Sequence, residues 1–122
     1  MWVKVKVRVI IAGSRTITSY SEVCKAIANS KFPIDEIVSG NAEGVDQYGE
    51  AYAIEMYLDL VIFPANWKLH KNKAGILRNI KMGNYADALV AVWDGKSRGT
   101  KHMIDYMTKL GKPVYVHEVT NV

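Results

Sequence analysis

The sequence contains a single cysteine, Cys24, among 122 residues, and this excludes an internal disulfide framework. Three histidines lie far apart without the spacing of a zinc site; they are His70, His102 and His117. No stretch approaches the roughly 20 consecutive apolar residues that a membrane-spanning helix needs. The N-terminal segment also lacks the apolar block and cleavage site of a signal peptide. We therefore expect a cytoplasmic protein that binds neither a metal nor a membrane.

The sequence also lacks an excess of either apolar or charged residues. Apolar residues make up 49% of the chain and charged residues 23%, which excludes intrinsic disorder. The length corresponds to one domain, and no linker or repeat divides it, so we expect a single domain over residues 1–122. The formal net charge of +4 favours anionic partners such as nucleotides, phosphates or nucleic acid without choosing among them. The basic residues are spread along the chain, unlike those of a dedicated nucleic-acid binder.

Apolar runs typical of buried strands alternate along the chain with segments of helical periodicity. Five strands are expected, at residues 3–12, 36–39, 60–63, 88–93 and 113–117. Four helices are expected between them, at residues 19–30, 44–58, 74–85 and 99–110, with a polar loop at 65–73. This alternation favours parallel βαβ units with right-handed crossovers. The sequence thus predicts an α/β fold, a Rossmann-like three-layer sandwich with a five-stranded parallel sheet.

Two of the expected helices have apolar positions at helical spacing. In the helix at 74–85 these are Ile76, Leu77 and Ile80. The last helix places Met103, Met107 and Leu110 on one face, and Gly111 is suited to end it. We expect these faces to pack against the sheet.

Polar loops follow the first four expected strands, and in an open parallel sheet ligands bind at this carboxyl edge. Three of these loops combine glycine with small hydroxyl or amide residues, as is needed where backbone amides approach a phosphate. Neither Gly-x-Gly-x-x-Gly nor a P-loop occurs, so a standard dinucleotide or ATP site is not supported. We predict a ligand site of another type, formed by Gly13, Ser14, Arg15, Gly40, Asn41, Gly44, Val45, Asp46, Asn66, Trp67, Arg78, Asn79, Asp94, Gly95, Ser97, Gly99 and Thr100.

The charged and hydroxyl residues of this set have two interpretations each. Ser97 and Thr100 flank Gly99 at the expected start of a helix, where they either hold an anion or cap the helix. Arg78 is a charged donor for the ligand or an exposed arginine in a surface ion pair. Arg15 and Arg98 are further charged donors in the neighbouring loops.

The aromatic and acidic residues near the same edge also have two interpretations each. Trp67 and Trp93 lie at or near strand ends, where an indole stacks on a base or seals the core. Asp46 complements the dipole of the second helix or binds a ribose hydroxyl.

The loops taken together carry a family resemblance that covers nearly the whole chain. The ordered pieces are residues 12–15, 38–46 and 64–67, then Ala74-Gly75 with Arg78-Asn79 and Met82, Ala86-Asp87, and Trp93-Asp94-Gly95 with Ser97 and Gly99-Thr100. This set resembles the YspA-like branch of the SLOG superfamily. The resemblance implies a Rossmann-like fold that binds a nucleotide or nucleotide-derived small molecule, and we expect a sensor or carrier of that ligand. No permanent cofactor is implied.

The superfamily includes the Lonely Guy phosphoribohydrolases, which release a base from a nucleoside monophosphate. Their Arg-x-x-x-Met, Asp and Gly-Gly-x-Gly-Thr-x-x-Glu pattern is similar to Arg78, Met82, Asp87 and the loop ending in Gly99-Thr100. The position of their catalytic glutamate falls on Met103, which cannot exchange a proton. Whether this chain is an enzyme therefore stays open.

Two other functions remain as alternatives. N-glycosidic cleavage of a nucleoside monophosphate needs a carboxylate from Asp94, Glu43 or Asp46. Single-stranded DNA binding follows from a likeness of the first two loops to the DNA-processing protein A group. The resemblance also implies pairing through helices, and a homodimer would use the Met-rich last helix and the second helix with Tyr48, Tyr52 and Tyr57.

Overall fold

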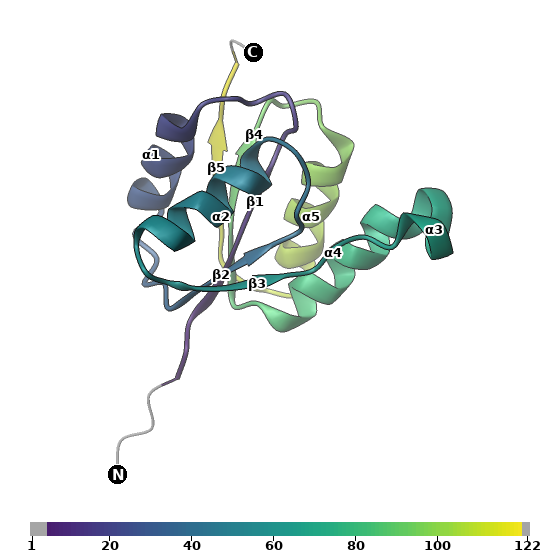
Figure 1. Ribbon diagram of the computed structural model, residues 1–122, viewed down its shortest axis with the longest axis horizontal. Helices are drawn as coiled ribbons and strands as arrows, with labels where there is room; N and C mark the ends of the chain where they lie inside the picture. The colour runs from purple at the N-terminus through teal and green to yellow at the C-terminus, as the bar shows by residue number, and fades with distance from the viewer. Residues whose placement is uncertain (1–4, 121–122) are drawn as a thin grey trace.

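The computed structural model describes residues 5–120, which form a five-stranded sheet in the order β3-β2-β1-β4-β5 (Figure 1). Every neighbouring pair of strands is parallel. The strands are β1 Arg8–Gly13, β2 Glu36–Ser39, β3 Asp59–Ile62, β4 Ala88–Trp93 and β5 Val114–Glu118. The predicted Rossmann-like α/β fold is thereby confirmed.

Helices cover both faces of the sheet and complete the three layers (Figure 1). They are α1 Tyr20–Ser30, α2 Val45–Glu55, α3 Trp67–His70, α4 Ala74–Tyr85 and α5 Arg98–Lys109, with a 3₁₀ turn, η1, at Lys71–Lys73. One core cluster joins the sheet to α1 and α2, and a second joins it to α4 and α5. The short α3 projects from the body of the molecule beyond the start of α4 (Figure 1).

The two central strands supply side chains to both clusters, because successive residues of a strand point to opposite faces. In β1, Val9 and Ile11 pack toward α1 and α2, whereas Ile10 and Ala12 pack toward α4 and α5. Five of the six residues of β4 are buried, and Trp93 is half-buried. Continuous apolar strands are the pattern expected where a parallel sheet is covered on both faces.

The first strand is shorter than predicted. It starts at Arg8, where pairing with β2 begins, and residues 5–7 have no neighbouring strand with which to form a ladder. Val5 is 76% exposed, and the amide of Val7 donates to Asp35 Oδ2 instead of to a strand. The part of the prediction that covers Val3 and Lys4 lies outside the described residues.

The segment at 65–73, predicted to be a polar loop, contains α3 and η1. The Asn66 side chain accepts a hydrogen bond from the Leu69 amide and caps α3. A helix of four residues spans about one turn, which is too short to show a periodic apolar face.

The apolar faces of the last two helices differ in part from the prediction. Met103 and Met107 are buried as predicted, but Leu110 is exposed because it forms the C-cap beyond the last turn of α5. Burying these methionines also removes the surface that they were expected to offer a second copy of the chain. Ile76 of α4 is exposed too, and its position is described with the pocket below. No helix within residues 5–120 is long and apolar enough to span a membrane.

Candidate ligand site

A pocket of about 540 Å³ lies where the strand order reverses, between β1 and β4. The loops after these two strands form part of its wall, and α4 and the loop after β2 form much of the remainder. This is the position at which open parallel sheets bind ligands, since neighbouring loops diverge there.

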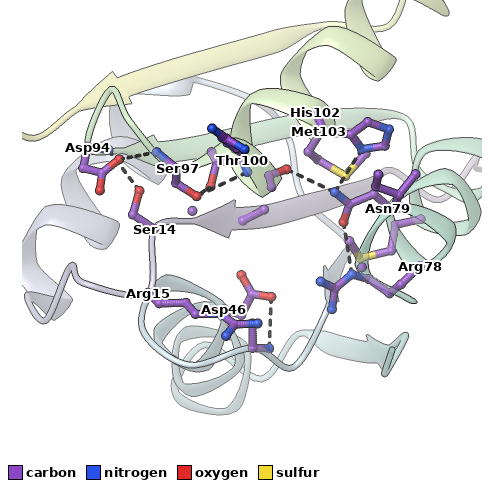
Figure 2. Close-up of a pocket in the computed structure, with 18 of the residues that line it drawn as sticks. Ser14, Arg15, Asp46, Arg78, Asn79, Asp94, Ser97, Thr100, His102 and Met103 are labelled. Carbon is purple, nitrogen blue, oxygen red and sulfur yellow. Dashed lines mark hydrogen bonds between the residues drawn. The ribbon is translucent and has the colours of Figure 1, made fainter. Parts of the chain in front are cut away.

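Eleven of the predicted site residues line this pocket. They are Gly13, Ser14, Arg15, Asp46, Trp67, Arg78, Asn79, Asp94, Ser97, Gly99 and Thr100. Figure 2 shows Ser14, Asp94 and Ser97 on one side and Arg15, Asp46 and Arg78 on another. The structure thus brings together residues that lie more than 80 positions apart in the chain.

The other six predicted residues lie behind the wall or at its edges, and three of them shape the loop after β2. The Gly40 carbonyl accepts a hydrogen bond from Arg78 Nη1 at 2.5 Å. Asn41 adopts a left-handed conformation with φ of 58°, and its amide donates to Ser39 Oγ. Val45 is buried beneath Gly13, and a Cβ added at Gly13 would stand 2.8 Å from Val45 Cγ2.

The remaining three have local structural roles. Gly44 has a φ of 75°, and a Cβ there would lie 2.7 Å from the carbonyl oxygens of both Ser14 and Arg15. Asn66 caps α3, and Gly95 takes a positive φ in the turn after β4. For these six residues the structure shows a scaffolding role.

The loop after β4 is held by Asp94. Its Oδ1 accepts hydrogen bonds from the amides of Lys96 and Ser97, each at 2.8 Å, and its own amide donates to Ser14 Oγ at 3.0 Å. The hydrogen bonds from the Lys96 and Ser97 amides lower the pKa of Asp94, because they favour the charged carboxylate. Asp94 is therefore ionised at neutral pH and ties the ends of β1 and β4 together.

Helix α5 begins at this loop, with Ser97 as its N-cap. Ser97 Oγ accepts from the Thr100 amide and lies 3.1 Å from Thr100 Oγ1. Thr100 is buried, so its hydroxyl is committed to the cap. The first turn of α5 places Arg98 and Gly99 on the pocket wall, at the end of the helix where the macrodipole is positive.

Asp46 and Arg78 lie close enough on the opposite wall to influence each other's charge, but among the described residues they form no ion pair. Asp46 is only 4% exposed, and its Oδ2 accepts a hydrogen bond from the Ala42 amide at 3.2 Å. Burial raises the pKa of Asp46 to about 6, although the Ala42 amide and the Arg78 charge act in the other direction. Burial also lowers the pKa of Arg78, but a guanidinium stays protonated in proteins.

A polar bridge connects α4 to α5 at the third side of the pocket. The Asn79 side-chain amide donates to the Gly99 carbonyl at 3.1 Å and to His102 Nδ1 at 3.2 Å. Asn79 Oδ1 in turn accepts from Arg78 Nε at 3.0 Å. Because Nδ1 of His102 is an acceptor here, the neutral ring carries its proton on Nε2.

Several pocket residues were missing from the predicted set of site residues, although Arg98 was named beside that set as a further charged donor. They are Ala12, Thr16, Ala42, Asn72, Gly75, Ile76, Met82, Lys96, Arg98, His102 and Met103. Thr16, Lys96 and Arg98 belong to loops that sequence reasoning had already selected, so their proximity to glycine was a usable signal. His102 and Ile76 lie within helices, and periodicity does not report which helical face meets a pocket.

Met103 is 1% exposed and takes part in the core cluster of α4 and α5. It lines the pocket, so the position where a catalytic glutamate was expected by resemblance does face this site. A thioether there supplies an apolar wall and no acid or base.

The charge of the pocket is positive. Four cationic side chains line it, Arg15, Arg78, Lys96 and Arg98, against the two carboxylates Asp46 and Asp94. Within the described part of the chain, Arg15, Lys96 and Arg98 take part in no ion pair. Residues 5–120 also contain no group of three or more His, Cys, Asp or Glu that could hold a metal ion. The arrangement therefore suits an anion.

The strand order and the position of the pocket define a Rossmann-like protein with a ligand site at the switch point of the sheet. The profile of the family described as "YspA, cpYpsA-related SLOG family" matches residues 7–70, just over half of the chain. The chain belongs to this family.

Two individual proteins resemble the chain. The Gene 61 protein of Mycobacterium phage D29 is 35% identical over 116 residues, which cover 88% of this chain and 93% of that protein. The structure of DNA processing protein A from Streptococcus pneumoniae superimposes with a TM-score of 0.71 at 15% identity. That likeness covers 96% of this chain but 52% of the other, so the chain spans about half of the larger protein and shares its fold.

Proposed function

We propose that the pocket binds the phosphate group of a nucleotide or nucleotide-derived small molecule, and that the protein is a sensor or carrier of that ligand. One observation carries the proposal: Arg15, Lys96 and Arg98 surround a pocket without forming an ion pair among the described residues. Unpaired cations beside a helix N-terminus favour the binding of a phosphate.

In this proposal the phosphate lies against the first turn of α5. Ser97 and Gly99 border that position, and Arg98 and Lys96 add charge from the same loop. Arg15 and Arg78 approach from the opposite wall (Figure 2). Arg78 is the best fixed of these cations, because its side chain bonds to Gly40 and Asn79.

Membership of the SLOG family supports a nucleotide-related ligand in general terms, and the pocket volume lies within the range of about 300–1,000 Å³ typical of small-molecule sites. Hydrogen bonds within the protein fix Asp94, Ser97 and Asn79 in the walls of the pocket. A formed site reduces the conformational entropy that binding must overcome.

The proposal is tested by calorimetric titration with adenosine, guanosine, cytidine and uridine 5′-monophosphates. An Arg98→Ala variant should bind about 10- to 150-fold more weakly, since a hydrogen bond to a charged group contributes about 1.5–3 kcal/mol. Lys109→Ala is the matched control, because it removes one positive charge from the other end of the same helix and lies outside the pocket. Equal affinities of the two variants would contradict the proposed site.

Single-stranded DNA is a second candidate ligand, since the fold matches that of a protein named for DNA processing. A strand that contacts several cations releases counterions, so its affinity falls steeply with salt. A mononucleotide should show a shallower dependence. Titrating a short oligonucleotide and a mononucleotide at 50 and 200 mM salt therefore separates the two candidates.

Cleavage of the ligand is a third candidate, favoured by the carboxylate of Asp46. Glu43 does not line the pocket, and the Asp94 carboxylate accepts two backbone amides. Asp46 alone combines a place in the pocket with a pKa near the working range of an acid or base. Chromatography of a nucleoside monophosphate incubated with the protein detects released base, and an intact ligand would assign the protein to binding only.

A further inference from the structure

We infer that Trp67, Gly75 and Ile76 form a separate subsite that takes the planar heterocycle of the ligand, with the Trp67 indole as its stacking surface. This inference rests on the proposed function for the phosphate end of the pocket. It adds the chemical class of the group that binds at the other end of the pocket. That group is an aromatic base and not a second anion, a sugar or an aliphatic chain.

The Trp67 indole makes little contribution to the packing of the fold. It lines the pocket yet is 51% exposed, and its Nε1 makes no hydrogen bond within residues 5–120. Trp93 provides the contrast, because its Nε1 donates to the Ser97 carbonyl at 3.0 Å and its ring is half-buried. An exposed indole on a pocket wall leaves apolar area that a ligand can cover.

Gly75 keeps the space beside this indole open. A Cβ at Gly75 would stand 3.6 Å from Trp67 Cη2 and 3.9 Å from Arg78 Nη2, so the glycine lies beside both groups. The indole and the guanidinium are planar π systems, and bases stack on both kinds of group. A side chain at residue 75 would occupy this space.

The neighbouring residues differ in chemistry from the phosphate end. Ile76 lines the pocket and is 49% exposed, although an apolar side chain in α4 would ordinarily face the sheet. Asn72 lines the same region, and its amide has no hydrogen-bond partner among the described residues. An apolar surface with one free amide suits the face and the edge of a base.

The backbone turn that carries Trp67 is fixed by a helix cap. Asn66 Oδ1 accepts from the Leu69 amide and closes the single turn of α3, which starts at Trp67. Leu69 in the same turn is 68% exposed and does not line the pocket. The turn therefore presents Trp67 to the pocket and Leu69 to solvent. A substitution at Leu69 is a matched control for the same substitution at Trp67.

The experiment compares two probes, adenosine 5′-monophosphate and ribose 5-phosphate, which share the phosphate and sugar and differ in the base. The wild type should bind the nucleotide about 5- to 100-fold more tightly, the range that stacking on one aromatic side chain provides. Trp67→Ala should remove this preference and leave the affinity for ribose 5-phosphate unchanged. Trp67→Phe should restore most of it, and Leu69→Ala should change neither affinity.

A second variant tests the same subsite without removing a side chain. Gly75→Leu adds a side chain beside Trp67 and Arg78 and keeps both of these residues, and a Cβ at residue 75 meets no atom closer than 3.6 Å. It should abolish the preference for the nucleotide with no loss of melting temperature. Binding of the nucleotide should also quench a tryptophan signal that is missing from Trp67→Phe.

The outcomes separate this inference from the proposed function. If the wild type binds both probes equally, or if Trp67→Ala keeps the preference for the nucleotide, the base subsite is wrong while the phosphate site stands. If the wild type binds neither probe, the proposed function fails, and the inference fails with it. A melting temperature measured for each variant excludes loss of fold as the cause.

Discussion

The carboxylate of Asp46 and the guanidinium of Arg78 both approach the backbone of Gly40. A Cβ at Gly40 would lie 2.9 Å from Asp46 Oδ2 and 2.6 Å from Arg78 Nη1. The two charged groups come from α2 and α4, and the absence of a side chain between them allows Arg78 to reach the Gly40 carbonyl. One glycine in the loop after β2 thus positions a cation of the pocket.

Replacing Gly40 with alanine should therefore impair binding more than folding. The new methyl group meets the end of the long Arg78 side chain and the carboxylate of the buried Asp46, so we expect the free energy of unfolding to fall by about 1–2 kcal/mol. Arg78 would lose its bond to the backbone, and affinity for a nucleoside monophosphate should fall about tenfold. Calorimetry and urea unfolding of the same preparation measure both effects; unchanged affinity would show that Arg78 does not need this position.

The buried carboxylate of Asp46 should make stability depend on pH. Its pKa rises from the ordinary 3.8 to about 6 on burial, so between these values the folded chain holds a proton that the unfolded chain releases. The stability contributed by this group is therefore greatest below about pH 3.8, falls by about 2–3 kcal/mol as pH rises to about 6, and is level above that.

The measurement is urea unfolding of the wild type and Asp46→Asn at several pH values between 4 and 7. Asparagine does not titrate, so the stability of the wild type relative to the variant should decrease across this range. The comparison cancels the carboxyl groups that the two proteins share. A difference that stays constant or grows with pH would contradict the assigned pKa.

The carboxylate of Asp94 should give stability the opposite dependence on pH. Its pKa is lowered by the Lys96 and Ser97 amides, so its contribution is present above the ordinary value of 3.8 and is lost as pH falls below it. Asp94→Asn keeps the shape but weakens both hydrogen bonds, and we expect a loss of about 1 kcal/mol at pH 7. Thermal unfolding at pH 7 and pH 3 checks this, with a smaller difference expected at the lower pH.

Two glycines of the predicted site should respond in opposite ways to alanine. At Gly13 a Cβ would lie 2.0 Å from the Val92 carbonyl oxygen in the neighbouring strand, so Gly13→Ala should cost about 3 kcal/mol or more, or prevent folding. At Gly99 a Cβ meets nothing within 4 Å inside the first turn of α5. Gly99→Ala should therefore raise stability by about 0.5–1 kcal/mol, and a fall in melting temperature would show that the turn needs glycine.

The strands and helices could be predicted because their signals are local. Residues 88–93 are apolar throughout and form β4, in which Trp93 is half-buried and the other five residues are buried. The helix at 67–70 escaped prediction because its single turn has no period to detect. The start of β1 was placed too early because alternating valines resemble a strand whether or not a partner strand lies beside them.

The sequence by itself determined the order of strands and helices and the loops that carry polar chemistry, because burial imposes periods of 2 and 3.6 residues on any chain. Only the tertiary structure decided which of these loops meet. The amide of Asp94 bonds to Ser14, 80 positions away, because the sheet order sets β4 beside β1. It also decided that Trp67, Ile76 and His102 face the pocket, since the orientation of a helix depends on the surface against which it packs.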